Sequence, residues 1–310
     1  MVIENKHIKC VLVGLGNIGV KYDINKKDLI QTHTKGIINN KNLKLICGVD
    51  KKKISRNLFK KEYQIKAVKN LETVTSNYRP DIFIVATPSN SHLKIIIKII
   101  KKFNPKLIIC EKPMGTNFKE AKKIVNLCKT KKIKLIINYI RRSDPVYLKL
   151  KNKLLKNKFT HGNFYYNHGF IHSCSHYVNL LCFFFGKCKK FQIVAVKKKL
   201  ENDYKIDCLL YFKKAFIKIN SINNKIKKEF ILEGNVGKIE KSKFKGMLIN
   251  GKKEKNTMQY YQKSFYANVN KFMSGKKNYY LCFGKEALEN FKLMSNIIKK
   301  ANEKLKIKKI

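Results

Sequence analysis

Three glycines near the N-terminus could bind a phosphate group. Gly14, Gly16 and Gly19 form a GxGxxG pattern in GLGNIG, directly after the apolar run 10–13. In a strand–turn–helix unit the first glycine permits a tight turn, the second lets the backbone approach a pyrophosphate, and the third allows close helix packing. The N-terminus of the following helix is expected to face the negative charge. We therefore assign dinucleotide binding to Gly14, Gly16, Asn17, Ile18 and Gly19.

An acidic residue ends the next predicted strand, 43–49. A carboxylate at this position, Asp50, can accept both ribose hydroxyls of NAD. Asp50 lies 31 residues after Gly19 rather than ~20, which predicts an insertion around 22–32. Three lysines at 51–53 could instead pair with a 2′-phosphate, so NADP stays open, although the carboxylate favours NAD.

Polar residues also end two further predicted strands, in ATPSNSH at 86–92 and CEKP at 110–113. Ligands bind at the carboxyl ends of parallel strands in open α/β sheets. The cofactor is therefore expected to lie against these segments as well. The residues assigned to it here are Thr87, Pro88, His92, Glu111 and Lys112.

Three histidines four residues apart, His168, His172 and His176, raise the question of a metal. Gly169 and the adjacent strand interrupt the helical register, and no carboxylate or thiolate joins the set at ligand spacing. We expect no metal site.

The elements that position these residues predict an α/β fold. Residues 1–142 alternate short apolar runs with helical patterns, which indicates a Rossmann domain with a doubly wound parallel sheet. Residues 143–310 predict an α+β domain for substrate binding and oligomerisation, with a largely antiparallel, open-faced sheet. The expected strands are 10–14, 43–49, 65–68, 82–86, 107–110 and 134–138, then 160–167, 191–197, 206–212, 215–221 and 229–233; helices are expected at 92–103, 118–129 and 175–185 and after Gly284.

Composition excludes several classes of protein. The 310 residues carry a net charge of +49, but only four of the 69 basic residues are arginine, which argues against specific nucleic-acid binding. Nine cysteines without a CxxC pair indicate reduced thiols rather than a disulfide framework or zinc ribbon. Neither a signal peptide nor a membrane-spanning run is visible, so the protein is expected in the cytoplasm.

Taken together, GLGNIG, ATPSNSH, EKP, NYIRRSDP at 138–145 and the HSCSH helix entrance at 172–176 resemble the glucose-fructose oxidoreductase and inositol 2-dehydrogenase family, Gfo/Idh/MocA. The resemblance implies that Lys112 lies beside the nicotinamide and the substrate hydroxyl, and that His176 is an acid/base or substrate ligand. His172 replaces the family's aspartate; it either shares in proton transfer or merely packs in a loop. Asn138, Arg142 and Asn179 are candidate substrate ligands, with ordinary loop and capping roles as the alternative.

The family implies an NAD(P)-dependent oxidoreductase acting on CH–OH groups of a sugar, cyclitol or nucleotide-linked sugar. The THTKG segment at 32–36 and HSCSH are similar to members associated with surface-polysaccharide sugar biosynthesis. A non-catalytic dinucleotide-binding sensor on the same fold is the alternative. The second sheet, with helices on one face, is expected to leave an apolar face that forms a homodimer or homotetramer.

Overall fold

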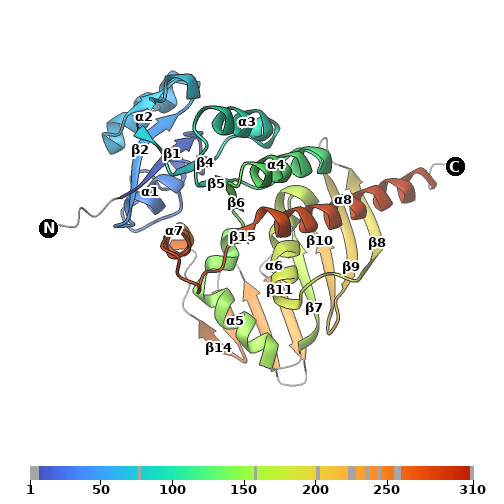
Figure 1. The fold of residues 1–310 in the computed structure, drawn as a ribbon. Coiled ribbons are helices and arrows are strands. Elements are labelled where there is room, and N and C mark those ends of the chain that lie inside the picture. Colours follow the sequence, from blue (N-terminus) through green and yellow to red (C-terminus); the bar gives the residue numbers. More distant parts are fainter. Residues whose placement is uncertain are drawn as a thin grey trace. The chain divides into compact units, whose positions relative to one another are not determined.

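Strands that the sequence predicts as buried on both faces form the first sheet of the computed structural model (Figure 1). The structure describes residues 7–75, 78–156, 159–199, 203–222, 228–234, 237–242, 246–254 and 260–307. The sheet has the order β15-β6-β5-β4-β1-β2-β3, and β1 to β6 are parallel. Its strands are Ile8–Val13 (β1), Leu43–Val49 (β2), Ala67–Val68 (β3), Ile82–Val85 (β4), Leu107–Cys110 (β5), Lys134–Ile137 (β6) and Cys282–Phe283 (β15). The order reverses between β1 and β4, where the strand ends form a ligand crevice in doubly wound folds.

Helices cover both faces of this sheet. On one face, Leu12 and Ile84 join a core with Ile37 of α1 and Phe265 of α7. On the other, the ring of Phe83 packs at a tilt against that of Phe103 at the end of α3, with centroids 4.9 Å apart. The helices are α1 (His33–Ile38), α2 (Lys53–Tyr63), α3 (His92–Lys102), α4 (Phe118–Thr130) and α7 (Tyr261–Met273), with short turns η1 (Lys21–Asp23), η2 (Leu71–Thr73), η4 (Ser89–Ser91) and η5 (Ile140–Ser143).

The chain folds into two compact units. Unit 1 contains residues 1–144 and 258–288, and unit 2 contains residues 145–257 and 289–310. These units differ from the two domains expected from the sequence in one segment, 258–288, which carries α7 and β15 into unit 1.

Unit 2 is built on an eight-stranded sheet of order β14-β13-β12-β11-β7-β10-β9-β8, antiparallel except for β7 beside β10. Its strands are Phe159–Tyr166 (β7), Lys190–Lys199 (β8), Tyr204–Tyr211 (β9), Phe216–Ser221 (β10), Lys228–Gly234 (β11), Gly237–Ser242 (β12), Gly246–Ile249 (β13) and Lys252–Glu254 (β14). The helices are α5 (Pro145–Lys156), the π-helix η6 (Phe170–Cys174), α6 (Ser175–Phe185) and the second part of α8 (Gly284–Ile307). The predicted fold class is thus confirmed.

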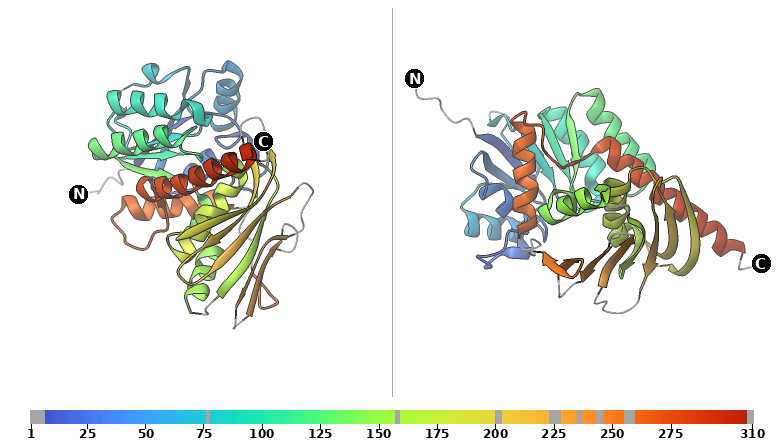
Figure 2. Two further views of the ribbon diagram at one scale, coloured as in Figure 1. Left: turned by 90° about the vertical axis from the view of Figure 1, so that its right-hand side faces the viewer. Right: turned by 90° about the horizontal axis from the view of Figure 1, so that it is seen from below.

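Helices cover one face of the second sheet, as Figure 2 shows for α5 and α6. Ile217 and Leu232 point into the core with Leu180 and Leu181 of α6. The other face is open but not uniformly apolar, which corrects the expectation: Phe216, 49% exposed, stacks on His161 and is followed on the same face by Lys218. Among the described helices, none has the length and apolar composition needed to cross a bilayer.

Candidate active site

The glycine-rich loop joins β1 to the end of β4. Gly14 has a φ of +101°, and a Cβ there would lie 2.5 Å from the carbonyl oxygen of Ala86. A Cβ on Gly19 would overlap the carbonyl oxygen of Gly14. By contrast, a Cβ on Gly16 has no described atom within 4 Å. Two glycines are therefore required by the protein itself, and the third leaves the space that a bound pyrophosphate needs.

The segment after this loop departs from the helix expected to follow it. A single turn, in which the N–H of Val20 donates to the carbonyl of Gly16 (2.8 Å), leads into η1 and then into an irregular stretch up to Thr32. Asp23 closes this stretch: its fully buried carboxylate accepts from the N–H of Gln31 (2.6 Å) and from the N–H and Oγ1 of Thr32 (2.9 and 2.8 Å). The predicted insertion corresponds to this closed loop, which ends where α1 begins with His33.

Asp50 lies where the sequence predicts, directly after β2. Its Oδ2 accepts the backbone N–H of Leu15 (2.9 Å) and its Oδ1 that of Lys52 (2.8 Å). The first bond links the carboxylate to the glycine-rich loop. Each oxygen keeps a lone pair for a ribose hydroxyl, so loop and carboxylate fit the adenosine half of NAD.

His92 connects the ends of β4 and β5. Its Nε2 lies 2.7 Å from the carbonyl oxygen of Thr87, and its Nδ1 lies 3.3 Å from Sγ of Cys110. Burial lowers the pKa of His92 and raises that of Cys110, so a neutral imidazole donates to Thr87 and accepts from a protonated thiol. Because both ring nitrogens are engaged, His92 serves to shape the Thr87–Pro88 loop, and its assigned contact with the cofactor stays a prediction.

Glu111 and Lys112 follow β5, at the same edge of the sheet. Oε1 of Glu111 accepts from Nδ2 of Asn138 (2.6 Å) and lies 2.9 Å from Nε2 of His33. Burial raises the pKa of Glu111, but the hydrogen bonds from His33 and Asn138, together with the charge of Lys112, outweigh burial and hold it below its ordinary value. Burial lowers the pKa of Lys112, Glu111 opposes this, and Arg141 adds to the lowering. The site thus pairs a carboxylate with a partly desolvated ammonium.

Two of the candidate substrate ligands lie in unit 1. Asn138 is 1% exposed, and its Oδ1 has no hydrogen-bond partner within the described ranges. Since its Nδ2 is held by Glu111, the amide presents an acceptor oxygen. Arg142 is also buried, and its Nη1 forms an ion pair with Oε2 of Glu286 (2.8 Å). Asn138 is therefore better prepared than Arg142 to receive a hydroxyl group.

The helix entrance that carries the two histidines lies in unit 2, where η6 runs directly into α6. Asp203, between β8 and β9, accepts the backbone N–H of Ile171 on Oδ1 and that of His172 on Oδ2, each at 2.9 Å. A Cβ on Gly169 would overlap this carboxylate. Asp203, more than 30 residues away in sequence, therefore holds the turn that carries His172, the residue that replaces the family's aspartate.

The predicted residues on this turn differ in exposure. His172 is exposed, and its ring lies edge-on to His168 with centroids 6.1 Å apart. His176 is half-buried in the first turn of α6, and Asn179, one turn later, is 1% exposed. The π-helix places position 172 inside a helix, whereas the sequence indicated a loop before one.

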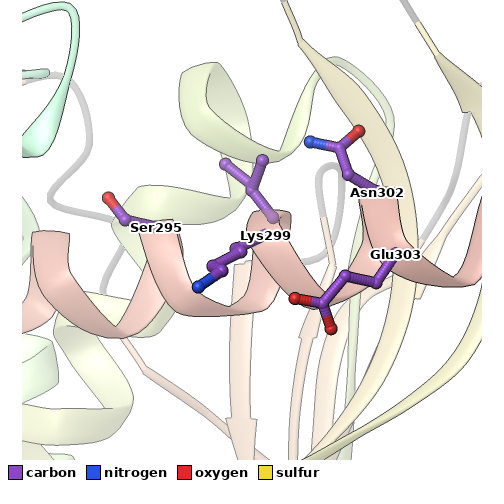
Figure 3. Close-up of a pocket in the computed structure, with 5 residues that line it drawn as sticks. Ser295, Lys299, Asn302 and Glu303 are labelled. Carbon is purple, nitrogen blue, oxygen red and sulfur yellow. The ribbon is translucent and has the colours of Figure 1, made fainter.

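Two other kinds of site, a metal centre and a surface hollow, find little support. Across the described ranges, no group of three or more His, Cys, Asp or Glu side chains is arranged to hold a metal ion. Figure 3 shows a hollow on α8 of unit 2, but it contains none of the predicted site residues. Its Asn302 already accepts the hydroxyl of Tyr204 at 2.9 Å. Its lining residues are Ser295, Ile298, Lys299, Asn302 and Glu303.

Sequence reasoning assigned no role to His33, Tyr266 or Asp203. His33 belongs to the THTKG segment, the one signal that could have drawn attention to it. Tyr266 and Asp203 carry no motif, and only the folded chain brings them to the site residues.

Known proteins resemble this chain in sequence and fold. Residues 8–139 match the family model described as an oxidoreductase family with an NAD-binding Rossmann fold. The rhizopine catabolism protein MocA of Rhizobium meliloti is 35% identical over 74 residues, covering 24% of this chain and 23% of that protein. The scyllo-inositol 2-dehydrogenase (NAD(+)) of Bacillus subtilis is 28% identical over 148 residues, covering 47% and 40%.

Among solved structures, the WlbA dehydrogenase of Bordetella pertussis, in complex with NADH and UDP-GlcNAcA, superposes with a TM-score of 0.74 at 17% identity, covering 96% of this chain and 97% of that one. At that identity the likeness is one of fold. The matched sequence spans well under half the length of the two curated relatives. For residues 8–139, the predicted family and the NAD-binding Rossmann fold are confirmed.

Proposed function

Because residues 8–139 belong to the NAD-binding Rossmann fold of the Gfo/Idh/MocA oxidoreductases, we propose that the protein is an NAD-dependent enzyme acting on a secondary hydroxyl or ketone of a sugar, cyclitol or nucleotide-linked sugar. The observation that carries the proposal is Lys112, a partly desolvated ammonium beside a carboxylate at the carboxyl end of β5. A cation in such a position stabilises negative charge that develops on a reacting oxygen.

Gly16 and Asp50 would hold the cofactor, the first by leaving room for the pyrophosphate and the second by accepting ribose hydroxyls. A 2′-phosphate would face the Asp50 carboxylate, which supports NAD over NADP. When bound, the nicotinamide supplies the site that accepts or donates hydride.

The protein's own groups handle the proton and the oxygen. In unit 1, Lys112 donates a hydrogen bond to the substrate oxygen and stabilises it as an alkoxide, and the acceptor Oδ1 of Asn138 can receive a further hydroxyl. The family resemblance assigns to His176 the acceptance of the proton when a hydroxyl is oxidised, or its return when a ketone is reduced, and makes Asn179 a further candidate ligand. The relatives that act on inositol or bind a nucleotide-linked sugar support this substrate class.

The test is a fluorescence titration with NADH and NADPH, followed by an absorbance screen of cyclitols, simple sugars and nucleotide-linked sugars with either nicotinamide redox state. Turnover of one of these classes, lost in Lys112→Ala, supports the proposal. Tight NADH binding without turnover of any of them would favour the sensor instead, a reading that the exposed histidine at position 172 supports.

Two further properties are proposed with the function. The open face of the second sheet, with Phe216 and Val194 exposed, supports assembly into a homodimer or homotetramer. All nine cysteines are free thiols, which supports a reducing location such as the cytoplasm.

A further inference from the structure

A chain of buried polar contacts leads from α7 to the residue before Lys112. The hydroxyl of Tyr266 lies 2.7 Å from Nδ1 of His33, and Nε2 of His33 lies 2.9 Å from Oε1 of Glu111. Tyr266 and His33 are both 0% exposed, and the Glu111 side chain is 12% exposed. Neither Tyr266 nor His33 has a role in cofactor binding or proton transfer as proposed above.

The direction of these hydrogen bonds follows from the carboxylate. Ionised Glu111 can only accept, so the imidazole carries a proton on Nε2 and donates it to Oε1 of Glu111. In that tautomer Nδ1 accepts from the Tyr266 hydroxyl, which keeps its proton because burial raises its pKa well above the ordinary value. Asn138 donates to the same carboxylate oxygen. Two donors directed at one buried oxygen favour the ionised carboxylate.

The rest of the THTKG segment holds this arrangement in place. Thr32 caps α1 by accepting the N–H of Lys35, and Oγ1 of Thr34 donates to the carbonyl of Gly19 in the nucleotide loop (2.7 Å). A Cβ on Gly36 would overlap the Tyr266 ring, so only glycine lets α1 and α7 approach closely enough. The segment is therefore built to bring His33 between Tyr266 and Glu111.

We propose that His33 and Tyr266 are positioning residues, which keep Glu111 ionised beside Lys112 and thereby keep Lys112 an ammonium that can donate to the substrate oxygen. The catalytic part of this role rests on the proposed function, whereas the electrostatic part does not. Unlike Lys112, the two residues act only through Glu111.

Other titratable groups also surround Glu111 and Lys112. Arg141, on η5, opposes the ammonium form of Lys112. Tyr261, on α7, has its pKa raised to about 12 by burial and nearby acidic groups, so it stays neutral near pH 7. His92 and Cys110 are neutral, as argued above. The negative charge that favours the Lys112 ammonium therefore comes from Glu111.

The experiment measures the reactivity of the Lys112 amine without cofactor or substrate. The full-length protein is treated with trace acetic anhydride over a range of pH, and acetylation of the Lys112 peptide is followed by mass spectrometry. Only the neutral amine reacts. In Glu111→Gln, loss of the neighbouring negative charge lowers the pKa of Lys112, so at a fixed pH below the midpoint the amine is expected to react roughly tenfold faster. In His33→Ala the buried carboxylate loses a donor, its pKa rises, and the rate is expected to increase in the same direction but by less.

Near-isosteric variants keep the test decisive if His33→Ala does not fold. Tyr266→Phe should give a smaller increase in the same direction, because the imidazole loses the bond that fixes its tautomer. His33→Gln, whose amide can still donate to Glu111, should restore most of the wild-type rate. Tyr279→Phe, in a ring cluster with Phe272 and Phe283, is the matched control and should leave the rate unchanged. An unchanged labelling midpoint in both Glu111→Gln and Tyr266→Phe overturns the proposal.

Activity then separates this inference from the proposed function. If a substrate is found, the alkaline limb of the rate profile should move to lower pH in Tyr266→Phe, since activity needs protonated Lys112. Faster labelling of the variants with no turnover of any sugar would leave the positioning role standing and reject the enzyme. Turnover with an unmoved alkaline limb and unmoved labelling would reject the positioning role alone.

Discussion

Gly16→Val separates ligand binding from folding, because the three loop glycines meet different surroundings. At Gly16 a Cβ has no described atom within 4 Å, whereas at Gly19 it overlaps a backbone carbonyl that cannot rotate away. Valine at position 16 should therefore fill the space of the cofactor and leave the protein's own packing unchanged. Gly19→Ala is the matched control that disturbs packing.

The magnitudes differ accordingly. An uncrowded surface change alters the free energy of unfolding by no more than about 0.5 kcal/mol, while overpacking costs about 1–3 kcal/mol. For a unit of this size the latter lowers Tm by roughly 2–12 °C. If valine breaks two charge-assisted hydrogen bonds to the pyrophosphate, at about 1.5–3 kcal/mol each, NADH affinity falls roughly 10²- to 10⁴-fold.

The assay combines thermal unfolding by circular dichroism with NADH titration by fluorescence. Gly16→Val should unfold at the wild-type temperature and bind NADH poorly, whereas Gly19→Ala should lose stability. If Gly16→Val bound NADH like wild type, or unfolded as early as Gly19→Ala, the loop would not hold the pyrophosphate as described.

Four further outcomes are expected. Asp50→Ala should weaken the affinity for NADH, measured by calorimetry, more than that for NADPH. Equal losses of affinity would contradict the contact between Asp50 and the ribose. Lys112→Ala and His176→Ala should each lower the rate 10²- to 10⁴-fold, or ~3–5 kcal/mol, with NADH affinity little changed. His172→Ala should lower the rate by a smaller factor. A rate loss in His172→Ala as large as in the other two variants would contradict the exposed position of His172. Asp203→Asn leaves one backbone N–H without an acceptor, so the free energy of unfolding should fall by ~1–3 kcal/mol. An unchanged Tm would contradict the role of Asp203 in holding the turn at Ile171 and His172. Light scattering at micromolar concentration should give a dimer or tetramer, not a monomer.

Much of unit 1 could be predicted because its central strands are buried on both faces and read as continuous apolar runs. The strands 43–49 and 107–110 were predicted with their observed ends. In unit 2, strands β12 to β14 were not predicted, because all three are short and two of them, β12 and β14, are rich in lysine. Helix α7 was missed as well, because its role depends on packing against α1, which lies more than 200 residues earlier.

Some residues of the candidate site could be predicted from the sequence and others could not. Asp50, Glu111 and Lys112 could be placed together because a parallel sheet collects strand ends at one edge. His33 and Tyr266 could not, since 78 residues separate His33 from Glu111 and 233 separate it from Tyr266. Hydrogen bonds between such distant positions leave no periodic trace in a single sequence. The cap on α4, by contrast, is local: Oδ1 of Asn117 accepts the N–H of Glu120, only three residues away, which is a pattern that a single sequence can indicate.

Residues 258–288 return to unit 1 before the chain ends in unit 2, so residues 145–257 of unit 2 interrupt unit 1. On the ribosome, the sheet strands up to β6 emerge first, while α7, which covers one of their apolar faces, follows only after about 120 further residues. At ~5–20 residues per second that interval lasts roughly 6–24 s. During it the nascent sheet exposes Leu12, Ile84 and their neighbours, and the polar chain to Lys112 lacks Tyr266. A product arrested before α7 would hold the nucleotide motif and the lysine yet remain an aggregation-prone intermediate, so quality control can act before any chemistry is possible.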